Sequence, residues 1–197
     1  MELDLVHDIQ AAYRKTVDSM ARPGLISNIR TQAAKVTLDI GCFSSTLVLA
    51  LMLFDTEKKF KVYSGQETEI TKFLSQLTYV TTTEAEKADF ILVSHNAAPG
   101  DLLEALAKAY PGDLLNPHQA ATVIVEADYL GNEKDLLLTG PGIERENYIR
   151  VQRTGNWVDV RTAKNSEYPL GIDLIFTDPQ DNILCLPRTT QIVETGG

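Results

Sequence analysis

The sequence predicts an α/β protein in which helices cover both faces of a mixed β-sheet. Short apolar runs of strand length alternate with segments of helix length along most of the chain, as in proteins built on a parallel sheet. Two further apolar runs near the C-terminus are joined by turn-forming residues and would add an antiparallel hairpin. Since a parallel sheet buries both of its faces, we expect a three-layer α/β sandwich, with residues 1–197 forming one domain.

An amphipathic helix is expected at residues 5–21, where apolar side chains recur at helical spacing. The expected core-facing residues are Leu5, Ile9, Ala12, Tyr13, Thr16, Val17 and Met20. Arg22-Pro23-Gly24 ends this helix, because proline disfavours helical backbone before it and glycine permits a turn. Residues 25–29 are then expected to be extended, and the length and leucine content of residues 43–54 favour a buried helix.

The alternation continues through the rest of the chain. The next expected elements are a strand at 60–63, a helix at about 68–77, a strand around 79–82, a strand at 90–93 and a helix at 101–110. Residues 121–126 and 136–139 are apolar runs separated by Gly131-Asn132, a spacing that suits antiparallel neighbours. The last expected elements are a short helix at 157–163 and the hairpin strands at 172–176 and 183–186.

Composition and charge argue against several classes of protein. The net charge is −9, whereas a broad nucleic-acid surface normally carries a basic field. The apolar run at 43–54 is too short to span a membrane, and the acidic start of the chain does not resemble a secretory signal. We therefore expect a cytoplasmic protein. Cys42 and Cys185 lie far apart without nearby histidines, which predicts two buried, reduced thiols, no disulfide and no metal site.

The sequence carries no familiar catalytic motif. The segment from Gly140 to Arg145 begins like a dinucleotide-binding fingerprint but lacks its third glycine. His7, His95 and His118 are scattered along the chain, and structural or surface roles are favoured for them over acid–base catalysis. A self-contained enzyme therefore has little support.

One candidate ligand site follows the last strand of the expected hairpin. Arg188, Thr189 and Thr190 bring a guanidinium and two hydroxyls to a strand end, where α/β proteins commonly bind ligands. The planar fork of arginine suits phosphate or phosphonate oxygens. Asp173 lies in an apolar strand and needs a partner, for which Arg188 is suitable. The pair is either a structural clamp or a shared binding edge, and an internal salt bridge is the simpler interpretation of Arg188.

A second candidate is a segment rich in arginine. Four of the eight arginines lie within seventeen residues of an otherwise acidic chain, namely Arg145, Arg150, Arg153 and Arg161. They imply a positive face that is either an anion pocket or a docking surface for an acidic partner. The alternative is a solvated face balanced by Glu144, Glu146 and Asp159.

Four blocks, taken together, resemble the H-subunit (PhnH) family of the bacterial carbon–phosphorus lyase core complex. They are Tyr13 to Gly24, Leu138 to Ile143, Pro169 to Phe176 and Pro187 to Thr190. The blocks follow the order of the family and extend over nearly the whole chain. They keep Arg188, Thr189, Thr190 and Asp173 as candidate ligand residues, and they add Gly171.

The resemblance implies a fold similar to that of pyridoxal-phosphate-dependent transferases, but without the residues that hold the cofactor. Consistent with this, none of the ten lysines lies in a recognisable cofactor context. No cofactor is expected, and similarity of fold alone does not imply pyridoxal chemistry.

The resemblance further implies a homodimer that joins the G, I and J subunits of the complex. Its implied role is to support transfer of ribose triphosphate from ATP to an alkylphosphonate, which gives α-D-ribose 1-methylphosphonate 5-triphosphate when the acceptor is methylphosphonate and releases adenine. The chain is not expected to be catalytic alone, and its catalytic residues, if it has any, are unknown. The alternatives are a structural adaptor without a ligand pocket and an independent small-molecule transferase.

Overall fold

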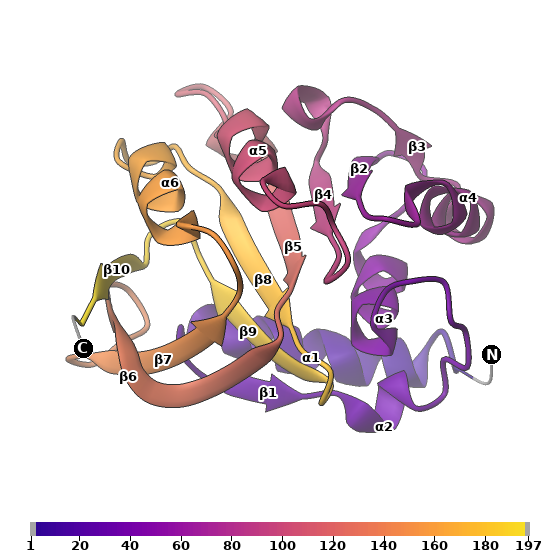
Figure 1. The fold of residues 1–197 in the computed structure, drawn as a ribbon, viewed down its shortest axis with the longest axis horizontal. Coiled ribbons are helices and arrows are strands. Elements are labelled where there is room, and N and C mark those ends of the chain that lie inside the picture. The colour runs from indigo at the N-terminus through magenta and orange to yellow at the C-terminus, as the bar shows by residue number, and fades with distance from the viewer. Residues whose placement is uncertain (1–2, 196–197) are drawn as a thin grey trace.

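Seven strands form the larger of two β-sheets in the computed structural model, which describes residues 3–195 (Figure 1). Their order across the sheet is β1 (Ile26–Asn28), β9 (Asn182–Leu186), β8 (Asp173–Thr177), β5 (Thr122–Glu126), β4 (Phe90–Val93), β2 (Lys59–Tyr63) and β3 (Thr81–Thr82). The strands from β8 to β3 are parallel, whereas β9 is antiparallel to both β8 and β1. The sheet is mixed and the terminal hairpin forms, as predicted.

A smaller sheet of three antiparallel strands was not predicted. It contains β10 (Gln191–Glu194), β6 (Tyr129–Thr139) and β7 (Asn147–Gln152), in that order. The expectation that residues 121–126 and 136–139 are antiparallel neighbours is wrong, because β5 lies between the parallel strands β4 and β8. Gly131 and Asn132 belong to β6 itself, where the pairing with β7 is irregular between Gly131 and Leu136.

Helices cover both faces of the larger sheet (Figure 1). They are α1 (His7–Ala21), α2 (Arg30–Ala33), α3 (Ser44–Leu53), α4 (Glu67–Thr78), α5 (Asp101–Lys108) and α6 (Trp157–Lys164). Alternate residues of each central strand point to opposite faces. On β5, Val123 and Val125 pack with α5, α6 and the smaller sheet, whereas Ile124 packs with α1, α3 and α4. The predicted α/β class is confirmed.

The buried face of α1 differs in part from the predicted one. Ala12 and Thr16 are buried, and Ile9 and Met20 pack against the core, as predicted. Leu5, before the helix, and Tyr13 and Val17 within it are 62%, 54% and 45% exposed. The buried residues of α1 are Asp8, Ala12, Thr16 and Ser19. Small side chains let the helix approach β9 closely, and the Cys185 thiol lies 3.7 Å from the Thr16 carbonyl. Lys35 neutralises the buried carboxylate of Asp8 at 2.8 Å, so this polar position tolerates burial.

The remaining predicted helices agree with the structure to within a few residues. In α3, Leu47 to Ala50 are fully buried, which explains the unbroken apolar run in this segment. Three short elements, α2 and the 3-10 turns at Ala85–Lys87 and Pro117–Gln119, were not predicted. Within residues 3–195, no helix combines the length and the apolar character that crossing a membrane requires.

Candidate functional site

Polar side chains gather at both edges of the larger sheet. The parallel strands end at one edge, which we call the carboxyl edge, and begin at the other, the amino edge. Ligands of α/β proteins usually bind at the carboxyl edge. Because β9 runs against β8, its last residue, Leu186, is paired with Leu174 near the start of β8. The residues after β9 therefore lie at the amino edge, so Arg188 follows a strand end as predicted but on the side opposite to the usual ligand position.

Arg188 and Asp173 form the pair that the sequence suggested. The Arg188 side chain donates from Nε to Asp173 Oδ1 at 3.3 Å and from Nη2 to Asp173 Oδ2 at 2.5 Å. The Arg188 backbone N–H donates to the same carboxylate at 2.7 Å, and Nη1 donates to the Pro117 carbonyl at 2.7 Å. Both side chains are less than one-fifth exposed. This set of bonds holds the guanidinium in one orientation.

Gly171 lets the chain before β8 pass close to Arg188. Its φ of +133° lies in a region that side chains rarely adopt. A Cβ atom at this position would lie 2.7 Å from Asn165 Oδ1 and 3.2 Å from the Cβ atom of Arg188. Gly171 therefore supports the position of Arg188 and offers no side chain to a ligand.

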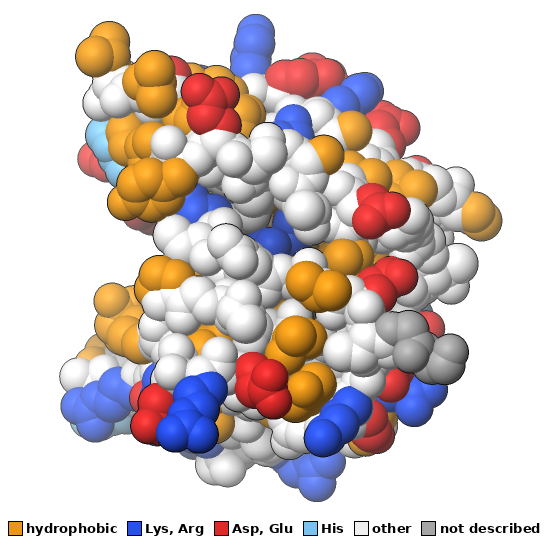
Figure 2. Space-filling model, turned by 90° about the vertical axis from the view of Figure 1, so that its left-hand side faces the viewer, with side chains coloured by type: hydrophobic (Ala, Val, Ile, Leu, Met, Phe, Trp, Pro, Cys, Tyr) orange, Lys and Arg blue, Asp and Glu red, His pale blue; other side chains and the backbone are white. Residues whose placement is uncertain are grey.

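A cavity of about 560 Å³ adjoins this pair, and we call it the amino-edge cavity. Its lining residues are Pro141, Arg161, Thr162, Asn165, Ser166, Tyr168, Leu170, Arg188, Thr189, Thr190, Gln191, Ile192 and Val193. Figure 2 faces the side of the molecule that carries α6 and β10, and it shows a hollow with basic side chains in its depth and hydrophobic side chains on its rim. The structure thus brings Arg188, Thr189 and Thr190 together at one cavity.

Arg161 reaches this cavity from α6 and is 1% exposed. Its Nη1 donates to the Thr190 carbonyl at 3.0 Å and its Nη2 donates to the Pro187 carbonyl at 2.6 Å. Within residues 3–195, neither Arg161 Nε nor the Thr190 hydroxyl has a hydrogen-bond partner. Burial lowers the pKa of Arg161 to about 10, although the nearby Asp173 opposes this shift. The expectation that Arg161 contributes to an exposed positive face is wrong, because it lies on the buried face of α6 with Trp157.

The other arginines of the predicted positive segment lie elsewhere. Arg145 and Arg150 are exposed, and Arg150 Nε lies 3.2 Å from Asp135 Oδ2. Arg153 is half-buried and donates to the carbonyls of Ser94 and His95 at 2.9 and 3.2 Å. They do not join Arg188 in one pocket.

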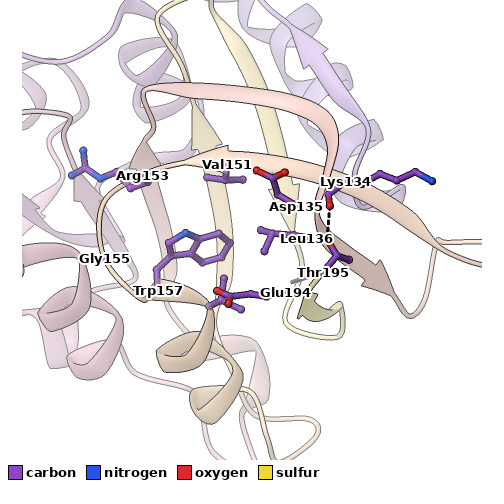
Figure 3. Close-up of a pocket in the computed structure, with 10 residues that line it drawn as sticks. Lys134, Asp135, Leu136, Val151, Arg153, Gly155, Trp157, Glu194 and Thr195 are labelled. Atoms are coloured by element: carbon purple, nitrogen blue, oxygen red, sulfur yellow. Dashed lines mark hydrogen bonds between the residues drawn. The ribbon is translucent and has the colours of Figure 1, made fainter. Parts of the chain in front are cut away.

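A second cavity, of about 490 Å³, lies between β6, β7, β10 and α6 (Figure 3). Trp157 is at its centre, and Figure 3 shows the cationic ends of Arg153 and Lys134 extending away from this ring on opposite sides. The carboxylates of Asp135 and Glu194 lie nearer to the ring. Because its cations do not converge, this cavity suits an anion less well than the amino-edge cavity does.

The carboxyl edge carries a pair that the sequence analysis did not identify, the His95–Glu126 pair. Glu126 ends β5 and is fully buried, and His95 follows β4 by two residues. The Glu126 carboxylate accepts hydrogen bonds from the Phe43 N–H at 2.5 Å, from the His95 N–H at 2.9 Å and from His95 Nδ1 at 2.7 Å. The rings of Phe43 and His95 stack with their centroids 4.7 Å apart.

These contacts fix the ring of His95. Since Nδ1 is bonded to Glu126, the other ring nitrogen is the one that can exchange a proton with a partner. The hydrogen bond to Glu126 raises the pKa of His95 above its usual value of 6.5. In the sequence, the pair was indicated only by position, because Glu126 ends one apolar strand and His95 closely follows another. That the two residues meet follows only from β4 and β5 being parallel neighbours.

Both cysteines are buried and unbonded to each other, as predicted. Burial raises the pKa of the Cys185 thiol to about 12 and also raises that of Cys42, so neither has the character of a reactive thiolate. Within residues 3–195, no three side chains of the metal-binding types converge.

Comparison with known proteins identifies relatives of the whole chain. Residues 3–193 match the family described as "Bacterial phosphonate metabolism protein (PhnH)". A protein of Rhizobium meliloti (strain 1021), named as α-D-ribose 1-methylphosphonate 5-triphosphate synthase subunit PhnH, is 30% identical over 192 residues. That alignment covers 96% of this chain and 92% of the relative.

A second relative matches over a shorter region. A protein of Stutzerimonas stutzeri, named as the C-P lyase subunit protein HtxG, is 38% identical over 114 residues. This alignment covers 57% of this chain and 55% of the relative, so it extends over about half of each. The match of residues 3–193 to the family confirms the resemblance seen in the sequence. This chain belongs to the PhnH family of bacterial phosphonate metabolism proteins.

Proposed function

We propose that this chain works in the cytoplasm as a subunit of a carbon–phosphorus lyase complex, where it supports transfer of ribose triphosphate from ATP to an alkylphosphonate with release of adenine. The observation that carries the proposal is the alignment over 192 residues with a protein named as a ribose 1-methylphosphonate 5-triphosphate synthase subunit. The alignment extends over 92% of that protein, so the whole relative is compared and not one domain of it.

The geometry supports a shared site over an independent transferase. A self-contained transferase needs a base, an electrophile-binding group and a substrate cavity within reach of one another. Here the His95–Glu126 pair lies at the carboxyl edge, whereas Arg188 and its cavity lie at the amino edge. Each edge supplies part of such a site, and the proposed G, I and J partners and a second copy of the chain would supply the rest.

The candidate residues take different roles in this proposal. Arg188 and Thr189 contact a phosphate or phosphonate group in the amino-edge cavity, and the buried Thr190 belongs to the same wall. Asp173 orients Arg188, and Gly171 makes room for it. Arg145 and Arg150 are exposed and supply a docking surface for an acidic partner, together with the half-buried Arg153.

Co-expression with the G, I and J subunits tests the proposal. The tagged chain is purified from these cells, and adenine release from ATP is measured with and without methylphosphonate. We expect a stoichiometric complex whose methylphosphonate-dependent activity disappears when this chain is left out. A chain that purifies alone, with activity unchanged by its absence, would contradict the proposal.

The same preparation separates the two alternatives. Adenine release by the purified chain alone, at the rate of the complex, would establish an independent transferase. A pure adaptor predicts that Arg188→Gln leaves the activity of the assembled complex unchanged. Our proposal predicts that this variant assembles normally and loses activity, because Arg188 faces the cavity and not the surface.

A further inference from the structure

We infer that the amino-edge cavity binds a compact oxyanion that carries a small apolar group, the chemistry of an alkylphosphonate, and that the buried Arg161 supplies the charge that attracts it. The inference rests on the proposed function only for the choice of ligand to test. Its physical basis is the charge, burial and hydrogen bonding of the residues that line the cavity.

The cavity holds an uncompensated positive charge. Two guanidinium groups, those of Arg161 and Arg188, line it, and Asp173 is bonded to Arg188 alone. No acidic side chain is among the described residues that line the cavity. The partners of Arg161 are neutral carbonyls, those of Leu186, Pro187 and Thr190. Two cations against one carboxylate leave a net charge of one, which a bound oxyanion would balance.

Two buried polar groups in this wall also lack partners among residues 3–195. They are Arg161 Nε and the Thr190 hydroxyl, on residues that are 1% and 2% exposed. Buried polar groups in proteins are almost always paired, so these two groups leave hydrogen-bonding capacity beside the cavity that the described chain does not use. Because these atoms lie beneath the cavity surface, they act on a ligand mainly through charge and dipole.

Direct contact comes from Arg188 and the hydroxyl of Thr189. A guanidinium has five N–H donors, and the bonds to Asp173 and Pro117 use three of those of Arg188. Two donors remain, in a group whose orientation is already set, so binding an oxyanion would cost little side-chain entropy. Thr189 adds a half-buried hydroxyl at the same wall.

The rest of the wall selects the class of oxyanion. Tyr168, Leu170 and Ile192 also line the cavity, and they offer it an apolar surface. An alkyl group would be buried there, whereas inorganic phosphate has none to bury. The net charge of one suits a single phosphonate group and is insufficient for a triphosphate, so ATP is not the expected ligand.

Titration of the purified full-length chain tests this inference. The probe is ethylphosphonate, and inorganic phosphate and ATP are the comparison ligands, all followed by isothermal calorimetry. We expect ethylphosphonate to bind more tightly than either. Arg188→Gln should weaken binding about tenfold or more, because a hydrogen bond to a charged group is lost. Arg150→Gln, at an exposed ion pair away from the cavity, is the matched control and should bind as the unaltered chain does.

Arg161→Gln removes the uncompensated charge and should also weaken binding about tenfold. If that variant does not fold, Thr190→Val replaces it, since the hydroxyl makes no hydrogen bond in the described chain and valine has the same shape. This substitution should weaken ethylphosphonate binding about threefold.

Several outcomes would overturn the inference. They are no binding of ethylphosphonate, equal affinity for inorganic phosphate, or unchanged binding in both Arg188→Gln and Thr190→Val. These measurements need no other subunit, so they are independent of the complex. A chain that assembles and supports adenine release but binds no ethylphosphonate would contradict the inference and leave the proposed function intact.

Discussion

The two edges of the larger sheet each bury an ionisable side chain, but its charge is balanced in different ways. At the carboxyl edge, the buried carboxylate of Glu126 accepts three hydrogen bonds, one of them from the side chain of His95. At the amino edge, the buried guanidinium of Arg161 has only carbonyl partners, and its Nε has no hydrogen-bond partner in the described chain. A buried charge whose hydrogen bonds are all made is costly to disturb, whereas a buried charge with an unpaired donor can attract a ligand.

Loss of the Glu126 carboxylate at the carboxyl edge should have the largest effect on stability. Glu126→Ala leaves the N–H groups of Phe43 and His95 without an acceptor, which should lower the free energy of unfolding by about 3 kcal/mol. Urea denaturation measures this change, with Glu133→Ala as an exposed-carboxylate control. A loss below about 1 kcal/mol would show that water replaces the carboxylate, and that Glu126 does not hold this edge together.

Gly171→Ala should disturb the packing around Arg188 at the amino edge. The new methyl group would meet Asn165 and Arg188 in a backbone conformation that side chains rarely adopt, which should cost about 2 kcal/mol of unfolding free energy. Gly100→Ala is the matched control, because Gly100 also has a positive φ but nothing lies within 4 Å of its added Cβ atom. Its smaller loss measures backbone strain alone. Equal losses in the two variants would mean that Gly171 does not set the position of Arg188.

The pH dependence of stability sharpens the comparison. Because the hydrogen bond to Glu126 raises the pKa of His95 above 6.5 in the folded chain, the protonated form stabilises the fold. This contribution is fully present below the unfolded pKa and is lost as the pH rises through the folded pKa. The side chain is 40% exposed, so solvent screening should keep the effect below about 1 kcal/mol. The test is to measure the free energy of unfolding from below the unfolded pKa of His95 to above its folded pKa, in the unaltered chain and in His95→Asn. If the two proteins lose the same stability as the pH rises, the His95–Glu126 pair does not form.

The smallest effect is expected for the exposed arginines. Arg150→Gln removes a surface ion pair with Asp135, both side chains being about half exposed, and should change the free energy of unfolding by less than about 0.5 kcal/mol. If Arg150 belongs to a docking surface, the variant should instead weaken assembly with the other subunits. Unchanged co-purification would exclude it from that surface.

Part of this arrangement could be predicted from the sequence, because burial leaves a clear pattern there. The apolar runs at 90–93, 172–176 and 183–186 are central strands, and their composition alone identifies them. Asp173 within such a strand required a cation, and Arg188 is that cation. The smaller sheet was missed because residues 132–135 of β6 are exposed and hide its length.

The rest of the candidate site depends on tertiary structure. Arg161 was grouped with its neighbours in sequence, and its burial follows only from the packing of α6 beneath the cavity. His95 and Glu126 lie thirty-one residues apart and meet because β4 and β5 are parallel neighbours. Glu126 ends one predicted strand and His95 follows another by two residues, but strand order is not visible in one sequence.

The most direct test of the contrast between the two edges is a titration with ethylphosphonate followed by NMR of the side-chain N–H signals. We predict that the Nε–H signals of Arg161 and Arg188 shift as the ligand fills the amino-edge cavity, while the ring signals of His95 stay in place. Shifts at His95 without any at the two arginines would contradict the account and place the ligand at the carboxyl edge.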